Sequence, residues 1–234
     1  RVAAVKGRSP RPLDDGGADN SPAIIKQPPR RNQTSTTVGR MAEAKIYDAE
    51  LNPTKDELVT RYSTMVERLG SYRAVDRDDK VGIEVIVGKN AEGALTQCAF
   101  SYRDKSIALD DELTPLTHSE LGERSVAPLT ADPVAVREIL QLILGGGEGA
   151  SFSTGEPIFP VRGTGQTPDV QVGEVEIDEH NPVTCLGEVT IDGVPQRFQL
   201  RIQREILDQH VASEEDLALV KDGGAILMRA EVWK

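Results

Sequence analysis

The centre of this chain reads Gln97-Cys-Ala-Phe-Ser-Tyr-Arg-Asp-Lys105 and, a few residues later, Thr114-Pro-Leu-Thr-His-Ser-Glu-Leu-Gly-Glu-Arg-Ser-Val126. The first part alternates like a half-buried strand, with Cys98, Phe100 and Tyr102 on one face. The second part surrounds a Leu-Gly pair with polar residues, which is typical of a turn that leads into a strand. We expect the rest of the fold to form around this strand and turn.

Strand signals on the N-terminal side of this centre predict an antiparallel sheet. Strands are expected at residues 72–75, 81–87 and 95–102, with a turn at 89–93 and a further short strand at 45–51. Two helical segments flank them, so the economical fold is α+β, an antiparallel sheet packed on two helices.

The two helices carry clear end signals. The first is expected to begin at Asn52-Pro53, with capping-box spacing from Thr54 to Glu57, and to end at Gly70. Its expected apolar face consists of Leu58, Tyr62, Met65, Val66 and Leu69. The second is expected to begin at Asp132-Pro133 and to end at the glycines 145–147, with an apolar face of Val136, Ile139, Leu140 and Ile143.

The remainder of the chain is rich in strand signals. Strands are expected at residues 158–161, 170–177, 185–191, 197–206 and 226–233, with Asp192-Gly193 as a hairpin turn and a short helix at 213–220. The sequence therefore predicts four parts: a basic, disordered Pro/Gly-rich extension at 1–40, an α+β domain at 41–146, a linker at 147–156 and a β-rich segment at 157–234. We expect the extension to be no part of the fold, and the sequence leaves open whether the last part folds by itself.

Charge and composition limit the classes of partner. Of 27 Lys/Arg and 38 Asp/Glu, eight basic and three acidic residues fall in 1–40, which leaves 19 basic and 35 acidic residues for the rest. A part this acidic repels nucleic acids and anionic membranes, so neither is expected as a partner. The two cysteines, Cys98 and Cys185, lie in apolar alternating runs and predict buried free thiols in a reducing cytoplasm.

A family resemblance follows from residues in a fixed order. Ser101-Tyr102-Arg103-Asp104, His118-Ser-Glu-Leu-Gly-Glu-Arg124 and Asp132-Pro133-Val134 resemble the N-terminal cap domain of bacterial maltokinases. Met41–Lys45, Leu51–Leu58 and Val81–Val85 are similar to the start and middle of that domain. The resemblance covers roughly residues 41–146 and extends to short stand-alone proteins that carry this cap without a kinase. It implies a cystatin-like arrangement with no chemistry of its own.

Six polar residues near the centre are candidates for an interaction site or a structural motif: Tyr102, Arg103, His118, Glu120, Glu123 and Arg124. In a catalytic interpretation, His118 moves a proton with Glu120 or Glu123 as its partner. In the structural interpretation, which we favour, the His and Arg side chains satisfy buried backbone or carboxylate groups. No catalytic, cofactor-binding or metal-binding residue is assigned, because the chain has no kinase, phosphate-loop or metal-ligand spacing.

Three hypotheses for the function remain. The first is a non-catalytic interaction or regulatory module of maltose, trehalose or glycogen metabolism, whose protein partner is an unknown enzyme of that metabolism. The second is a carbohydrate-binding module, which requires exposed aromatic residues. The third is an enzyme centred on His118, which requires that His118, Glu120, Glu123 and Arg124 converge in a cleft.

Overall fold

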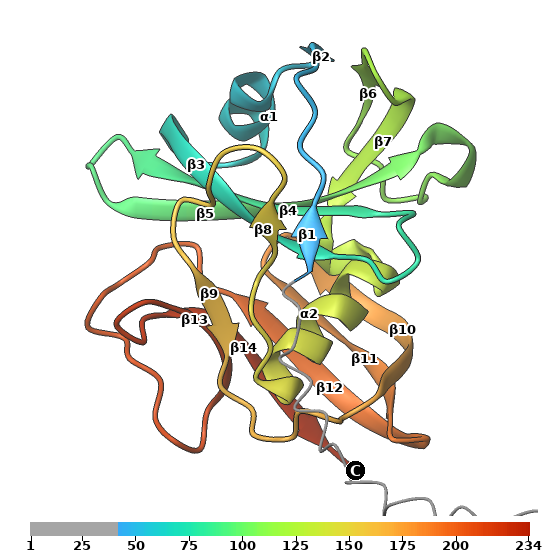
Figure 1. Ribbon diagram of the computed structural model, residues 1–234, viewed down its shortest axis with the longest axis vertical. Helices are drawn as coiled ribbons and strands as arrows, with labels where there is room; N and C mark the ends of the chain where they lie inside the picture. The colour runs from blue at the N-terminus through green and yellow to red at the C-terminus, as the bar shows by residue number, and fades with distance from the viewer. Residues whose placement is uncertain (1–41) are drawn as a thin grey trace, which may run out of the picture. The chain divides into compact units, whose positions relative to one another are not determined.

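The computed structural model describes residues 42–234. The expected extension at 1–40 lies outside the described residues. Among these, 49% are in strands and 14% in helices, so strands dominate. The larger elements form two six-stranded sheets and two α-helices (Figure 1).

The first sheet is antiparallel and has the residues 97–126 at its centre. Its strands, in spatial order, are β2 (Leu51–Asn52), β6 (Thr114–His118), β7 (Gly122–Pro128), β5 (Leu95–Asp104), β4 (Gly82–Asn90) and β3 (Met65–Val75). The short 3₁₀ turns η1 (Lys105–Ile107) and η2 (Leu129–Ala131) follow β5 and β7. The expected strands at 72–75, 81–87 and 95–102 are confirmed.

The first sheet is buried on both of its faces. Successive side chains of a strand point to opposite faces, and β4 shows the consequence. Ile83 and Val85 belong to a core shared with the second sheet, whereas Ile86 packs in a separate core with Leu58 of α1 (Lys55–Tyr62). The face that carries α1 also carries the cavity described below.

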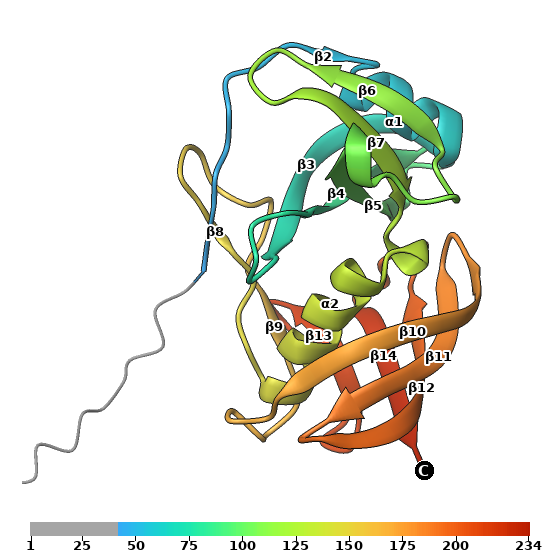
Figure 2. The same cartoon turned by 90° about the vertical axis from the view of Figure 1, so that its right-hand side faces the viewer.

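The second sheet holds most of the C-terminal part of the chain. Its strands, in spatial order, are β10 (Val172–Asn181), β11 (Thr184–Ile191), β12 (Val194–Ile202), β14 (Ile226–Trp233), β13 (Leu217–Lys221) and β9 (Val161–Gly163). It curves around α2 (Pro133–Gly145), which lies between the two sheets (Figure 2). The hairpin at Asp192-Gly193 is confirmed, with positive φ at both residues.

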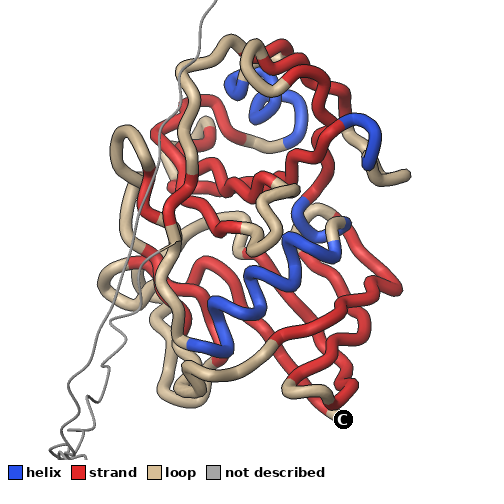
Figure 3. Tube along the Cα trace, turned by 45° about the vertical axis from the view of Figure 1, so that its right-hand side comes forward, coloured by secondary structure: helices blue, strands red, loops and turns tan. Residues whose placement is uncertain are grey.

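The expected fold class, an antiparallel sheet packed on two helices, is wrong. The molecule is mostly β, and only α1 covers the outer face of the first sheet; α2 packs on β10, β13 and β9 of the second (Figure 3). The reason lies in the composition of α2, whose buried residues surround much of its circumference: Ala135, Val136, Glu138, Ile139, Leu140, Ile143 and Leu144. A helix that is apolar on most sides is buried between layers rather than laid on one surface.

The first helix is shorter than its apolar pattern predicts. The capping box of Thr54 and Glu57 is confirmed, but Thr54, not Asn52, is the N-cap, and the helix ends at Tyr62. The Ser63 hydroxyl donates to the Val59 carbonyl at 2.6 Å. The chain then continues as β3, because pairing with β4 extends back to Met65. Val66 and Leu69, expected on the helix face, are exposed.

Two further expectations are wrong for the same reason, that a distant partner decides the local structure. The expected helix at 213–220 is a turn, in which the Ser213 amide donates to the Asp216 carboxylate at 2.8 Å, followed by β13. β13 is a strand because β14 and β9 pair with it on both sides. The expected strand at 45–51 is mostly irregular; only its end, Leu51, enters β2.

Residues 147–156, the expected linker, are tied to other parts of the fold. The Ala150 amide donates to the Arg73 carbonyl at 2.9 Å, and β8 (Ser151–Phe152) pairs in parallel with β1 (Glu43–Ala44). The two large sheets also share a core, to which Val85 and Phe198 both belong. The expected division at residue 146 therefore crosses a continuous set of contacts.

Cys98 is half-buried and Cys185 is buried, and both are free thiols. Burial raises the pKa of each to about 12. Between residues 42 and 234, no helix has the length and apolar character that a membrane crossing requires.

Candidate functional site

A cavity of about 1030 Å³ lies on the outer face of the first sheet. The segment 43–51, from β1 to the start of β2, forms one wall, the start of α1 at Thr54–Asp56 another, and the β3–β4 loop at 76–81 a third. The apolar side chains of Leu51, Ile107, Leu116 and Leu121 complete the lining. The volume lies at the upper end of the roughly 300–1,000 Å³ of small-molecule sites.

The floor of this cavity consists of five polar side chains from five strands: Arg73, Glu84, Tyr102, Arg124 and His118. Strand register brings them to one face of the sheet. Arg73 is paired with Glu84 across β3 and β4. Arg124 of β7 is paired with Leu116 of β6 and with Asp104 of β5. His118 lies two residues after Leu116, and Tyr102 lies two residues before Asp104. Residues that alternate by two share a face, so all five belong to the cavity side.

Glu84 is the most deeply buried group of the floor, with 0% of its surface exposed. Its Oε1 accepts hydrogen bonds from Lys55 Nζ at 2.7 Å and from the Ser71 hydroxyl at 2.8 Å, and lies 3.1 Å from Nη2 of Arg73. The Tyr102 hydroxyl donates to Oε2 at 3.2 Å. Burial alone would raise the pKa of Glu84, but the charges of Arg73 and Lys55 outweigh it and hold the pKa at about 2.

The floor around Glu84 carries more positive than negative charge. One carboxylate faces two cations, Lys55 and Arg73, whose side chains are 28% and 19% exposed. Within the part of the chain that the structure describes, the buried Nε of Arg73 has no hydrogen-bond partner. Lys55, Arg73 and Glu84 together thus have a net charge of +1 at neutral pH, and Arg73 has one hydrogen-bond donor without an acceptor.

His118 is held by the turn that follows it. Its Nδ1 accepts from the backbone amides of Glu120 at 3.1 Å and Leu121 at 3.2 Å. This fixes the neutral tautomer with the proton on Nε2. Partial burial and then the charge of Arg124 lower the pKa of His118. Tyr47 stands edge-on to the imidazole, with ring centroids 5.6 Å apart.

Arg124 is the floor cation with the weakest ion pair. Its Nη1 lies 3.9 Å from Asp104 Oδ2, and its side chain is 15% exposed. Asp104 is engaged elsewhere, because its Oδ1 accepts from the amide and hydroxyl of Ser106 at 2.9 and 2.6 Å. The guanidinium of Arg124 is therefore a lightly compensated charge in the floor of the cavity.

The structure separates the six candidate residues of the central stretch. Tyr102, His118 and Arg124 line the cavity. Glu120 contacts His118 through its backbone amide, and the Glu123 carboxylate accepts from the Thr117 hydroxyl at 2.9 Å. A proton-shuttling His118 requires a carboxylate partner. Glu120 contacts it only through the backbone, and the carboxylate of Glu123 is bound to Thr117 instead.

Arg103 has a structural contact on the opposite face of the sheet. It donates to both carboxylate oxygens of Asp132, from Nε at 2.7 Å and from Nη2 at 2.6 Å. Asp132, which is fully buried, also accepts from the amides of Val134 and Ala135 and so caps α2. One ion pair therefore fixes the start of α2 to β5.

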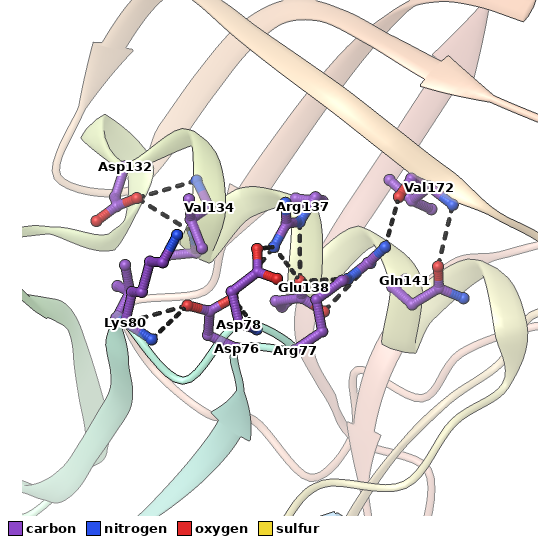
Figure 4. Close-up of polar contacts among 12 residues, drawn as sticks. Asp76, Arg77, Asp78, Lys80, Asp132, Val134, Arg137, Glu138, Gln141 and Val172 are labelled. Atoms are coloured by element: carbon purple, nitrogen blue, oxygen red, sulfur yellow. Dashed lines mark hydrogen bonds and ion pairs between the residues drawn. The ribbon is translucent and has the colours of Figure 1, made fainter. Parts of the chain in front are cut away.

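The rim loop at 76–81 is anchored to α2 by a second set of ion pairs (Figure 4). The Asp76 carboxylate accepts from the amides of Asp78, Lys80 and Val81, which shapes the loop. Arg137 lies 3.1 Å from Asp76. Arg77 donates to Glu138 at 2.8 Å and to the Val172 carbonyl at 3.2 Å. These charges hold one wall of the cavity in place (Figure 4).

Lys55, Arg73 and Glu84 are site residues that the sequence pattern did not predict. Glu84 did carry a signal, because it is a single charge inside the apolar run 81–87. A charge in a strand of this kind is buried only with a partner. The partners themselves, Arg73 and Lys55, follow from strand register and helix placement, which the local pattern does not contain.

A metal site and a second hollow are the other possible sites. Across residues 42–234, no three His, Cys, Asp or Glu side chains are grouped so as to hold a metal ion. A second hollow, of about 510 Å³, lies on the second sheet beside Leu217, Arg229 and Trp233. Trp233 is 42% exposed there. Arg229 also has a buried Nε without a partner among the described residues, but this hollow has no fully buried carboxylate like Glu84, so the cavity of the first sheet is the better candidate.

Comparison of this chain with models of protein families, with curated proteins and with solved structures finds no match.

Proposed function

We propose that this protein is a non-catalytic regulatory module that binds a carbohydrate in the cavity of the first sheet. The observation that carries the proposal is the floor of that cavity, where donors and acceptors converge beside apolar walls. Sugars present hydroxyl groups and apolar C–H faces together, and ligand sites of this size combine apolar lining with a few placed polar groups.

The state of the two titratable groups supports binding rather than proton transfer. Glu84 accepts from several donors, and its pKa of about 2 makes it a poor base near neutral pH. His118 uses Nδ1 to hold its own turn, and its Nε2 carries a proton that can be donated to a hydroxyl oxygen. Both groups are fixed in place, which suits recognition.

The resemblance to the maltokinase cap supports the metabolic setting. On this basis the protein acts in the bacterial cytoplasm with an enzyme of maltose, trehalose or glycogen metabolism, and its ligand state is passed on to that partner. The edge strand β3 supports a protein contact, because Val66 and Leu69 are 68% and 42% exposed there.

Titration calorimetry of the full chain against maltose, trehalose, maltooligosaccharides and glycogen tests the proposal. Tyr47 and Trp233 give a matched pair of variants, since each is 42% exposed and only Tyr47 lines the cavity. We expect Tyr47→Ala to weaken saccharide binding roughly fivefold or more, because an aromatic contact is lost. Trp233→Ala is expected to leave the affinity unchanged. Absence of heat with every saccharide, or loss of binding in Trp233→Ala alone, would refute the proposed site.

A further inference from the structure

The charges of the cavity define what kind of carbohydrate it suits, and this inference rests on the function proposed above. The rim carries two ion pairs, Arg68 with Asp56 at 2.6 Å and Lys45 with Asp79 at 3.7 Å, besides Lys80 and the acids Glu43 and Glu50. These rim groups are exposed, so solvent screens them. The floor is shielded from solvent and is not balanced.

Three cations approach the floor from different elements, Lys55 from α1, Arg73 from β3 and Arg124 from β7. Three acids lie among them: Glu84, which neutralises one charge; Asp76, which is buried and paired with Arg137 of α2; and Asp104, which is half-exposed, bound by Ser106 and 3.9 Å from Arg124. The exposed acids Glu43 and Glu50 lie on the outer wall. The buried part of the cavity therefore retains positive charge after its ion pairs are counted.

The three cations also act on one point. Burial and the charge of Arg124 lower the pKa of His118, the charge of Glu120 raises it, and the charges of Lys55 and Arg73 lower it further. His118 remains neutral and adds a donor without adding an anion. A negatively charged group beside His118 and Arg124 would be stabilised by these charges, since charge-assisted hydrogen bonds are about twice as strong as neutral ones.

We propose that the cavity selects an anionic sugar, a monosaccharide-sized polyol with one phosphate or carboxylate group, and that Arg124 binds its oxyanion. Lys55 and Arg73 keep Glu84 ionised, and the partly exposed His118 and Tyr102 are the polar groups available to the sugar hydroxyls. A planar guanidinium with its fixed donors is the side chain best matched to either oxyanion.

The test is calorimetry of the full chain in a phosphate-free buffer at neutral pH, with glucose, glucose 6-phosphate, glucuronate and inorganic phosphate as probes. We expect the two anionic sugars to bind about tenfold more tightly than glucose, the scale of one hydrogen bond to a charged group. Added NaCl is expected to weaken the anionic sugars and to leave glucose unaffected. Arg124→Gln is expected to abolish the tenfold preference, and Arg124→Lys to keep most of it.

Arg201→Gln is the matched control, because Arg201 is an exposed arginine of β12 outside the cavity. It is expected to keep the preference. Thermal unfolding of each variant confirms that the altered binding does not come from loss of the fold. Arg124→Lys retains the charge, so restored preference in that variant separates a charge effect from damage to the sheet.

The outcomes distinguish this inference from the proposed function. Equal affinity for glucose and for the anionic sugars overturns the charge selection and leaves the carbohydrate site in place. A preference that survives Arg124→Gln overturns the role of Arg124. Inorganic phosphate bound as tightly as glucose 6-phosphate overturns the inference, because the sugar then contributes nothing, and also removes support for a carbohydrate-binding function.

Discussion

At the scale of single residues, the main feature of this protein is a set of four buried carboxylates: Asp76, Glu84, Asp132 and Glu138. Each is paired with at least one arginine, and three of the four also accept hydrogen bonds from further donors of the chain. Burial of an acid is tolerated only with such compensation. Three of these acids fix α2 or the rim loop, and Glu84 alone lies in the floor of the cavity.

We predict that Glu84→Gln lowers the free energy of unfolding by about 3 kcal/mol or more, because Lys55 and Arg73 lose the charge that compensates them in a buried site. Urea denaturation at neutral pH measures this change. Glu231→Gln is the control, since Glu231 is exposed on β14, and its effect is expected to stay within about 0.5 kcal/mol. Equal effects of the two variants would contradict the role of Glu84.

The pH dependence of stability gives a second prediction for Glu84. Its pKa is about 2 in the folded protein against 4.5 for an unperturbed Glu, so the unfolded chain takes up the proton first as the pH falls. The stabilisation is therefore complete above pH 4.5 and is lost progressively toward pH 2. Between pH 4.5 and pH 2, the free energy of unfolding is expected to fall less steeply with pH in Glu84→Gln than in the native protein. Parallel pH profiles would show that Glu84 is not the titrating group.

The Arg103–Asp132 pair is expected to matter far more than a surface pair of the same kind. Arg103→Gln leaves the fully buried Asp132 without its charge partner, which we expect to cost about 3–5 kcal/mol of unfolding free energy. Arg197 and Asp178 are 2.7 Å apart but 37% and 50% exposed, so Arg197→Gln is expected to cost less than about 1 kcal/mol. Similar losses in both variants, measured by urea denaturation, would contradict the structural role of Arg103.

At the scale of elements, the pairing of β3 with β4 decides where α1 ends. Two irregularities in register, between Met65 and Glu67 and between Arg68 and Gly70, let β3 follow β4 along its full length. Gly88 stands opposite Arg68 at this point. A side chain at Gly88 would overlap the Glu67 carbonyl oxygen and come within 2.7 Å of Met65 Cγ.

We predict that Gly88→Ala destabilises the protein by about 1–3 kcal/mol, because the backbone of β3 cannot move away without losing its pairing. Gly82→Ala on the same strand is the matched control. Its added Cβ would meet Tyr102 Cβ at 3.4 Å, close to ordinary contact, so a smaller loss is expected. Thermal unfolding measures both, and a larger effect of Gly82→Ala would argue against the described register.

At the scale of the whole molecule, Gln97 links the two large sheets. Its Nε2 donates to the carbonyls of Gln203 and Leu227, each at 2.8 Å, and its Oε1 accepts from the buried Tyr72 hydroxyl at 2.8 Å. A backbone hydrogen bond also links the two parts, since the Ile206 amide donates to the Leu95 carbonyl at 2.8 Å. Together with the shared core, these contacts couple one sheet to the other.

We predict that the two sheets of residues 42–234 unfold in one transition, and that Gln97→Ala costs about 3 kcal/mol because several buried polar groups lose their partner. The single tryptophan, Trp233 in β14, reports the second sheet by fluorescence, and hydrogen exchange reports the first. Coincident transitions support the coupling. Retained protection of the first sheet after the fluorescence transition of Trp233 would show two independent domains.

The sequence by itself determined the features that depend on neighbours along the chain. The capping box at Thr54, the Asp132 cap with left-handed Gly146 at the end of α2, and the Asp192-Gly193 hairpin each rest on contacts within a few residues. Such contacts leave a local pattern. The strands 95–102 and 226–233 were predicted for the same reason, because alternation is a local property.

Only the tertiary structure decided what depends on distant partners. Residues 65–69 and 217–220 have apolar spacing that also fits a helix, and they are strands because β4, β14 and β9 pair with them. The placement of α2 on the second sheet and the assembly of the cavity floor also depend on contacts between segments that are distant in the sequence. Arg73, Glu84 and Arg124 meet through strand register, which hydrogen bonds between remote segments fix and which no short stretch of sequence records.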